Sequence, residues 1–512
     1  MTVGVIARMF GVATAVFLVS ACAAIQPSGI DEQSLLDQAR ADRVSAREGV
    51  EPIEGKLSLD EAMARALKYN LDRRVKMMEE ALAFKELDVS KADMLPRLVA
   101  QAGYDWRNND KISQSRNSQT GALSTSRFIS QEREHETASL ALSWNILDLG
   151  VGYYSAKQQA DRVLIASERR RKAMHLLMQD VRTAYWRAYS AQRLRARVRA
   201  TTREAEAALT DARRAEQEKL RNPLDSLRYQ RQVLENLRLL ESIDQELSTA
   251  QIELASLINA PLNQKLVLIA PRATTNRKVL RIPVEVMEET ALVANADLRQ
   301  EHYNARIARV ETRKVLLKLF PNLIFKYGGN HDTDVYLLNN NWLDASAQLS
   351  YNLFNLLTAP TRMKLAKAGV SLADQRRVAM QMAVMAQVHL ARQNYANALR
   401  QFARADAIWE TDRRIAEHMK NREAVEAQSK LDSVANQTTA ILSLLRRYQA
   451  LALAQAAEAK LQATLGVDPP IGSVDELSLA ELSREIAASG GVRTEAASAS
   501  RARIPERKAA KL

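Results

Sequence analysis

Residues that interrupt helices are scarce in this chain of 512 residues, which has 16 glycines and 12 prolines. No glycine occurs between Gly152 and Gly328, and no proline occurs between Pro360 and Pro469. Because glycine and proline form turns and end helices, such gaps predict very long helices. A doubly wound α/β enzyme of this length needs many glycine-bearing turns, so this class is largely excluded.

Long apolar runs and cysteines are also scarce. Residues 9–20 form the one long apolar run, which excludes a bundle of transmembrane helices. The single cysteine, Cys22, leaves no pair for a disulfide and no thiol chemistry elsewhere in the chain.

The formal net charge is +13, a sign that can indicate nucleic acid or anionic lipid as a partner. The tail from Ala487 onward carries six Lys and Arg against two Glu, so it supplies +4 of this charge. The remainder is spread through Arg-rich and Glu-rich sequence. We interpret it as the solvated faces of helices and predict no nucleic-acid partner.

The N-terminus has the pattern of a secretory signal. Arg8 precedes the apolar residues 9–20, and the small residues Val19-Ser20-Ala21 lead to Cys22. A cysteine in this place resembles a bacterial lipobox, so residues 1–21 are predicted to be a lipoprotein signal peptide and Cys22 the lipid attachment site. The alternative is an ordinary signal peptide with an incidental cysteine. We expect residues 22–56 to form a mostly extended N-terminal tether.

The chain contains an internal repeat. Residues 138–145 recur as residues 345–352, an offset of 207 that also matches Leu224-Asp225-Ser226 with Leu431-Asp432-Ser433. Upstream the offset is 225, because Pro96 matches Pro321. The difference of 18 residues predicts an insertion in the first copy. The predicted segments are a first structural repeat (57–262), an equatorial linker (263–283), a second structural repeat (284–470) and a largely disordered C-terminal tail (471–512).

Each copy shows the same order of elements. A helix ended by proline, 58–93 or 284–319, precedes two short segments in which polar and apolar residues alternate. A helix of about 65 residues and a returning helix follow, and small residues form a heptad stripe along the long helix. The predicted fold class is mainly α with a small antiparallel β part: a tandem-duplicated protomer of long helical hairpins plus four strands.

The alternation predicts that each strand has an apolar face and a polar face. In the first strand Leu98, Tyr104 and Trp106 oppose Arg97 and Gln101. The other three strands have the same pattern, with these residues on their polar faces: Ser143, Lys326, Gln348 and Ser350.

No catalytic constellation is found. The six histidines are dispersed, and the chain has no HExxH, CxxC or GxSxG motif and no phosphate-binding loop. We therefore predict that the protein is not an enzyme and has no cofactor or metal.

The plan of two strands and a long hairpin, duplicated behind a lipobox, resembles the TolC-type outer-membrane efflux factor family. The features that carry the resemblance cover residues 57–469 and recur in order in both copies: Leu59-Asp60-Glu61-Ala62, Leu95-Pro96, Leu142-Ser143-Trp144-Asn145 and Leu431-Asp432-Ser433.

The resemblance implies a homotrimer in which four strands from each protomer close a 12-stranded β-barrel that an α-helical barrel continues. It implies a lipid-anchored protein of the cell outer membrane that extends into the periplasm. Its implied partners are outer-membrane lipid, a periplasmic adaptor and an inner-membrane pump, which supplies energy for export of small molecules or metal ions. Alternatives are the outer-membrane component of type I protein secretion and a lipid-anchored coiled-coil scaffold without a pore.

Two groups of site residues follow from the resemblance. Asp432 and Asp225, at the hairpin tips, are candidates for a periplasmic gate of carboxylates; the alternative is that they are N-cap or exposed turn residues. Trp106, Trp144, Tyr327 and Tyr351 are candidates for aromatic residues at the lipid interface; the alternative for each is ordinary core packing.

Overall fold

The computed structural model describes residues 29–218, 222–271, 275–424, 430–469 and 471–492, and the chain divides into two compact units, 1–52 and 53–512. The described part of the first unit contains the helix α2 (Glu32–Ser45), whose N-terminus is capped by the Asp31 side chain. The expectation of a mostly extended tether is therefore wrong for residues 32–45. No glycine or proline interrupts them, and the cap satisfies an N–H group of the first turn.

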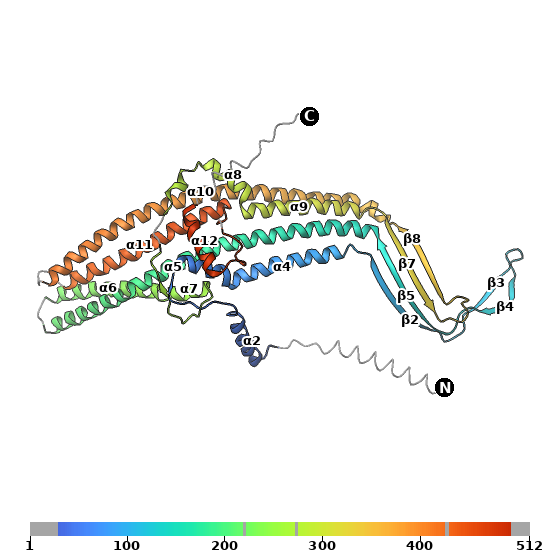
Figure 1. Cartoon of the computed structure of the whole chain (residues 1–512), viewed down its shortest axis with the longest axis horizontal. Coiled ribbons are helices and arrows are strands. Elements are labelled where there is room, and N and C mark those ends of the chain that lie inside the picture. Colours follow the sequence, from blue (N-terminus) through green and yellow to red (C-terminus); the bar gives the residue numbers. More distant parts are fainter. Residues whose placement is uncertain (1–28, 219–221, 272–274, 425–429, 470, 493–512) are drawn as a thin grey trace, which may run out of the picture. The chain divides into compact units, whose positions relative to one another are not determined.

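The second unit consists of long helices that run directly into a small sheet (Figure 1). Its first repeat contains α3 (Leu59–Tyr69), α4 (Leu71–Ala92), β2 (Arg97–Trp106), β3 (Ile112–Arg116), β4 (Leu123–Ile129), β5 (Glu134–Asn145), α5 (Ile146–Gln217), α6 (Pro223–Ser248) and α7 (Ala250–Leu257). The second repeat contains α8 (Val284–Ala294), α9 (Ala296–Leu317), β7 (Asn322–Asp332), β8 (Asn341–Ser350), α10 (Phe354–Ala424) and α11 (Lys430–Leu465). Between and after the repeats lie the 3₁₀ helix η1 (Arg277–Arg281) and α12 (Leu479–Val492), and the short strand β1 (Lys56–Leu57) pairs in parallel with β6 (Val267–Leu268).

The strands and the helices follow the same lateral order. The antiparallel sheet has the order β2-β5-β7-β8. The helices attached to these strands pack in the order α4-α5-α9-α10, so each strand and its helix occupy the same place in two successive layers (Figure 1). In the hairpin half of the unit the order becomes α6-α5-α11-α10. The predicted mainly helical fold with four antiparallel strands is confirmed.

Two predicted helices are each broken once. The expected helices 58–93 and 284–319 are interrupted at Asn70 and Asn295, which have nearly identical extended backbone angles, with ψ of 129° at both. The Asn70 Oδ1 accepts a hydrogen bond from the Arg73 N–H and so caps the following helix. The breaks have a local cause, because an asparagine side chain satisfies the N–H groups that a break leaves without partners.

The same asparagines also attach each break to the end of the returning helix. Asn70 Nδ2 donates to the Leu257 carbonyl at 3.0 Å, and Asn295 Nδ2 donates to the Thr464 carbonyl at 2.8 Å. The acceptors are related by the offset of 207 and the donors by the offset of 225. The duplication therefore extends to a matched hydrogen bond within each repeat.

The two returning helices end in the left-handed conformation at matched positions. Asn259 has φ of 54° and Gly466 has φ of 69°. A Cβ atom at residue 466 would overlap the carbonyl group of Ala294, directly before the second break. Asparagine tolerates left-handed backbone better than other non-glycine residues, whereas only glycine fits the close approach in the second repeat.

The core of the second unit follows the predicted heptad stripe of α5. Along this helix Ala156, Val163, Val181, Ala184 and Ala188 are buried. A second row of side chains on the same helix is buried as well, at Met178, Tyr185 and Tyr189. The helix therefore packs on several sides, against α4, α9, α6 and α11.

Two further elements were not predicted in full. The insertion of the first repeat includes an antiparallel hairpin of β3 and β4, which extends the loop between β2 and β5 (Figure 1). The C-terminal tail was expected to be largely disordered from residue 471, which is wrong for residues 479–492: these form α12, which packs on α3 and has Leu479, Leu482 and Ile486 buried. Among the described helices, none is both long and apolar enough to cross a membrane.

The left-handed position of Gly466 makes a stability prediction. Gly466→Ala should lower the free energy of unfolding by about 1–2 kcal/mol for the backbone conformation alone, with a further cost for overlap with Ala294. Thermal unfolding followed by far-UV circular dichroism measures this change.

Gly369→Ala is the matched control. Gly369 lies within α10 with open space around its Cβ position, so alanine there should stabilise the helix by about 0.5–1 kcal/mol. Equal midpoints for the two variants would contradict the role given to Gly466.

Candidate membrane sheet and helix tips

The register of the sheet places the alternating residues on two continuous faces. Leu98, Leu142, Tyr327 and Ala345 are directly opposite one another across the four strands. One residue further along, the row consists of Arg97, Ser143, Lys326 and Ser346. Residues opposite each other in antiparallel strands point to the same face, so one face is mainly apolar and the other mainly polar.

The apolar face is exposed in the isolated chain. Leu98 is 66% exposed, Tyr327 is 57% exposed and Leu343 is 71% exposed. Exposed apolar area of this extent marks a surface that another phase or molecule covers.

The four candidate interface aromatics are divided between the two ends of the sheet. Trp106 is the last residue of β2, whereas Trp144 lies at the opposite end, next to the start of α5. Tyr351 directly follows β8 at the same end as Trp144. Tyr327 is in the middle of β7, and the register places it opposite Leu142, two residues before Trp144 on β5.

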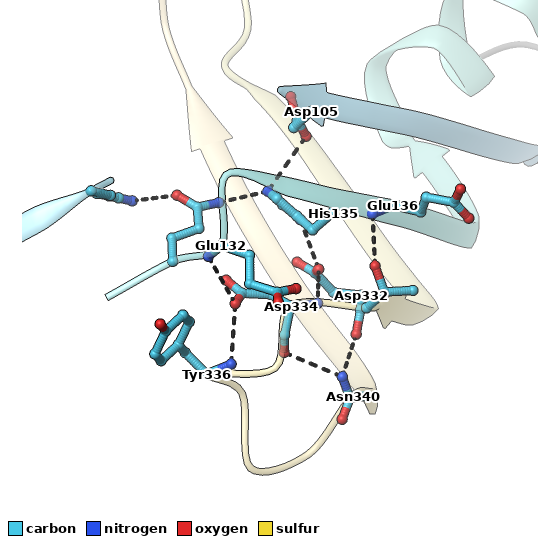
Figure 2. A network of polar contacts seen from close by, with 11 residues as sticks. Asp105, Glu132, His135, Glu136, Asp332, Asp334, Tyr336 and Asn340 are labelled. Carbon is cyan, nitrogen blue, oxygen red and sulfur yellow. Dashed lines mark hydrogen bonds and ion pairs between the residues drawn. The ribbon is translucent and has the colours of Figure 1, made fainter. Parts of the chain in front are cut away.

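The end of the sheet away from the helices contains a polar network that sequence reasoning missed. The buried His135 on β5 contacts Asp332 on β7, with 2.8 Å between Nδ1 and Oδ1. Figure 2 shows this pair and, beside it, Asp334 in the loop after β7. The Asp334 Oδ1 accepts from the N–H groups of Glu132 at 3.2 Å and Tyr336 at 3.1 Å. The network joins the loop after β7 to the segment before β5.

Further contacts fix the same loop. Asn340 Nδ2 donates to the Asp332 carbonyl at 2.6 Å, and the Thr333 Oγ1 accepts from the Glu136 N–H at 2.8 Å (Figure 2). Outside the sheet, Arg133 forms two hydrogen bonds with Asp110 and lowers the pKa of that carboxyl. Because Thr333 and Glu136 are separated by 197 residues in sequence, as are His135 and Asp332, no local pattern identifies these two pairs.

Near the sheet, the helices are joined by polar contacts. On α5 the side chains of Gln158, Gln159 and Asp161 are buried. Gln158 donates to the Ile307 carbonyl at 3.1 Å, Gln159 donates to Glu86 at 2.5 Å, and Asp161 is paired with Arg306. Buried polar groups are tolerated when they are paired in this way, so these contacts fix α5 relative to α4 and α9.

A charged cluster lies where α5 passes the second helix break. Burial raises the pKa of Glu168, against the opposing charges of Arg171 and Arg299. For Asp468, burial alone would raise the pKa, but the hydrogen bond from His175 and the charge of Arg171 hold it below its usual value. Among the described residues, no group of three or more His, Cys, Asp and Glu side chains is arranged to hold a metal ion.

The hairpin tips place the two candidate gate residues differently. Asp225 is in the first turn of α6, its side chain is 66% exposed, and its Oδ1 is 3.7 Å from Arg228 Nη1. Asn222, not Asp225, caps this helix, because its Oδ1 accepts from the Leu224 N–H. Asp432 is in the first turn of α11, but its side chain lies outside the described residues, as does Cys22.

The fold is shared with solved outer-membrane channels. No protein-family model and no curated protein matches the sequence. The outer-membrane channel OprN matches with a TM-score of 0.61 and 15% identity, over 80% of this chain and 90% of that chain. The Campylobacter jejuni CmeC outer-membrane channel matches with a TM-score of 0.60 and 13% identity, over 84% and 89%. The Neisseria gonorrhoeae MtrE outer-membrane channel matches with 0.58 and 14%, over 80% and 88%.

The chain therefore shares its fold with solved outer-membrane channels. At the level of fold, the resemblance to the TolC type is confirmed.

The Asp334 network generates a prediction on loop stability. Asp334→Ala leaves the N–H groups of Glu132 and Tyr336 without this acceptor, so amide exchange in residues 333–340 should accelerate on the order of tenfold. Hydrogen exchange with mass spectrometry measures the change.

Two controls separate the network from a general charge effect. Asp334→Asn keeps the Oδ1 acceptor and should leave exchange close to that of the natural chain. Asp344→Ala removes an exposed carboxylate that contacts Asn330 and should not change exchange in this loop. Equal acceleration in all three variants would contradict the assignment.

Proposed function

We propose that this chain is one protomer of a passive, trimeric outer-membrane exit duct. One observation carries the proposal: an exposed sheet with an apolar and a polar face continues, strand by strand, into a layer of helices in the same order. The fold shared with outer-membrane channels supports it.

The two lateral edges of the layer support closure by other copies. Within the four-stranded sheet, β2 and β8 each pair with one strand only, and an open strand edge cannot remain in lipid. The helices attached to these strands also expose apolar side chains, such as Met78 and Leu82 on α4 and Leu365 and Leu372 on α10. Because the two edges differ, head-to-tail association is the geometry that closes a ring. Three protomers with four strands each complete the proposed 12-stranded barrel.

The proposed orientation follows from the two faces. The apolar face contacts lipid, while the polar row with Arg97, Ser143, Lys326 and Ser346 lines a water-filled passage. Trp106 at one end and Trp144 with Tyr351 at the other then lie near the two lipid interfaces, with Tyr327 between them.

The remaining parts of the proposal concern attachment and partners. Lipidation of Cys22 anchors the chain to the outer membrane, and the helices extend into the periplasm. The tips dock with a periplasmic adaptor and an inner-membrane pump, which supplies energy for export of small molecules or metal ions. At the tips, Asp225 and Asp432 of three chains contribute carboxylates that narrow the passage and favour cations.

Adjacent residues on β5 provide a test of the two faces. Leu140→Arg places a charge on the proposed lipid face between the two ends of β5, at a cost of about 2–4 kcal/mol near the bilayer midplane, and should abolish stable channels. Ser139→Arg places the same side chain on the passage face, in the row of Gln101 and Asn330, and should preserve insertion while it lowers cation preference. Planar-bilayer recordings on purified oligomers measure both effects.

The same recordings test the proposal as a whole. Intact oligomers of the natural chain that form no channel would overturn it and favour a scaffold without a pore. Equal loss of channels in both arginine variants would contradict the assignment of the faces.

The tip carboxylates provide a second test. The double variant Asp225→Ala, Asp432→Ala should raise single-channel conductance and weaken cation preference, because it removes six negative charges from a trimer. Glu235→Ala is the control, since Glu235 is an exposed carboxylate on α6 away from the tip. If the recording is identical to that of the natural chain, the two aspartates form no gate and are ordinary turn residues.

A further inference from the structure

The β3–β4 hairpin has no counterpart in the second repeat, and the proposed duct does not use it. Every residue from 111 to 130 is exposed except Ser124, which is partly exposed. Two-stranded hairpins are marginally stable in water on their own, so a hairpin of this kind gains stability from a surface that covers it.

The base of the hairpin is fixed to the sheet. Arg133 and Asp110 form paired hydrogen bonds of 2.6 and 2.9 Å, and the Ser130 N–H donates to the Lys111 carbonyl at 2.9 Å. Arg107 N–H donates to the Arg133 carbonyl at 2.8 Å. The hairpin therefore begins at a defined place beside the end of the sheet that is remote from the helices (Figure 1).

The hairpin contains cations and no carboxylates. Residues 111–131 include Lys111, Arg116 and Arg127 but no Asp or Glu. The carboxylates of this region lie at or below the base, at Asp110 and from Glu132 onward. Its charge is therefore positive along the whole hairpin.

One face of the hairpin near its base combines a cation with apolar side chains. Ile112 is opposite Ile129 and Gln114 is opposite Arg127, so these four residues share one face, whereas Ser113 and Phe128 belong to the other. The register then shifts, and nearer the tip Arg116 is opposite Leu123. Ile112, Leu123 and Ile129 are 56%, 61% and 44% exposed. Apolar side chains interleaved with cations are typical of segments that lie on an anionic lipid surface.

We propose that the hairpin is a membrane-surface anchor, whose face with Ile112 and Ile129 contacts a lipid surface and whose Lys111, Arg116 and Arg127 pair with lipid phosphate groups. This inference rests on the proposed insertion of the sheet, because insertion brings the base of the hairpin to the membrane surface. Charge complementarity selects the partner: a surface rich in phosphate suits a segment with three cations and no carboxylate.

The test uses full-length chain reconstituted in vesicles. Thr125 lies on β4 two residues before Arg127, and Thr125→Cys in a Cys22→Ser background accepts an environment-sensitive fluorophore. The vesicles contain phosphatidylcholine alone or with phosphatidylglycerol, and both contain lipids that carry a quencher. We expect stronger quenching in the anionic vesicles, and less of it at high salt because exposed charges are screened.

Charge variants identify the cause of the quenching. With Lys111, Arg116 and Arg127 all changed to Gln, the ratio of quenching in anionic to neutral vesicles should fall to about 1. The control changes three exposed arginines of the hairpin helices α5 and α6, Arg214, Arg228 and Arg238, to Gln and should leave the ratio unchanged.

A second label separates this inference from the proposed function. A fluorophore at Leu142→Cys reports insertion of the sheet. If the Leu142 label is quenched and the Thr125 label is not, the hairpin proposal is overturned while the duct remains supported. If neither label is quenched, the insertion on which both depend is overturned. The Thr125 label could instead be shielded from water to the same extent in both kinds of vesicle and in the triple Gln variant. This result would show that the hairpin contacts a second copy of the chain and not lipid.

Discussion

The second unit depends on the direct continuation of each strand into a helix. Asn145 ends β5 and Ile146 begins α5 without a loop, and the other three junctions are short. Neighbouring strands are about 4.8 Å apart, whereas packed helices need about 8–10 Å. The helices must therefore diverge as they leave the sheet, and the order of neighbours is the property that both layers can share. This constraint explains why α5 contacts α4 on one side and α9 on the other, in the same order as the strands β2, β5 and β7.

The two repeats have the same features at several matched positions and differ at a few others. Asn70 and Asn295 break their helices in the same way and contact matched carbonyl groups. The residue that ends each returning helix in the left-handed conformation differs: it is Asn259 in the first repeat and Gly466 in the second, where only glycine fits. The hairpin of β3 and β4 belongs to the first repeat, and α12 covers α3 and not its counterpart α8. The repeats thus share the asparagine hydrogen bond at the helix break and differ at the end of the returning helix, in the outer hairpin and in the covering of the first short helix.

Much of this fold could be predicted because its signals are periodic or repeated. Alternation along β2 and β5, the heptad stripe of α5 and the matched prolines Pro96 and Pro321 each have a period or an offset that a single sequence displays. The helix breaks at Asn70 and Asn295 were missed, because asparagine within a helical pattern is a weak signal without the carbonyl that it contacts. The pair of His135 and Asp332 was missed for a related reason, since its partners meet only when β5 and β7 pair. Tyr327 shows the limit for single positions: its face could be predicted, but its height in the sheet depends on register.

The mixture of polar and apolar buried positions along α5 has a consequence for how such chains can change over time. Near the sheet, Gln158, Gln159 and Asp161 each depend on a particular partner on α4 or α9. A substitution at one of these positions leaves its partner unpaired, so tolerated changes there should occur at two positions together. By contrast, Ala184, Ala188 and Val198 need only a neighbour of suitable volume. Lineages that keep this fold should therefore show paired substitutions at the buried polar positions and independent ones at the apolar positions.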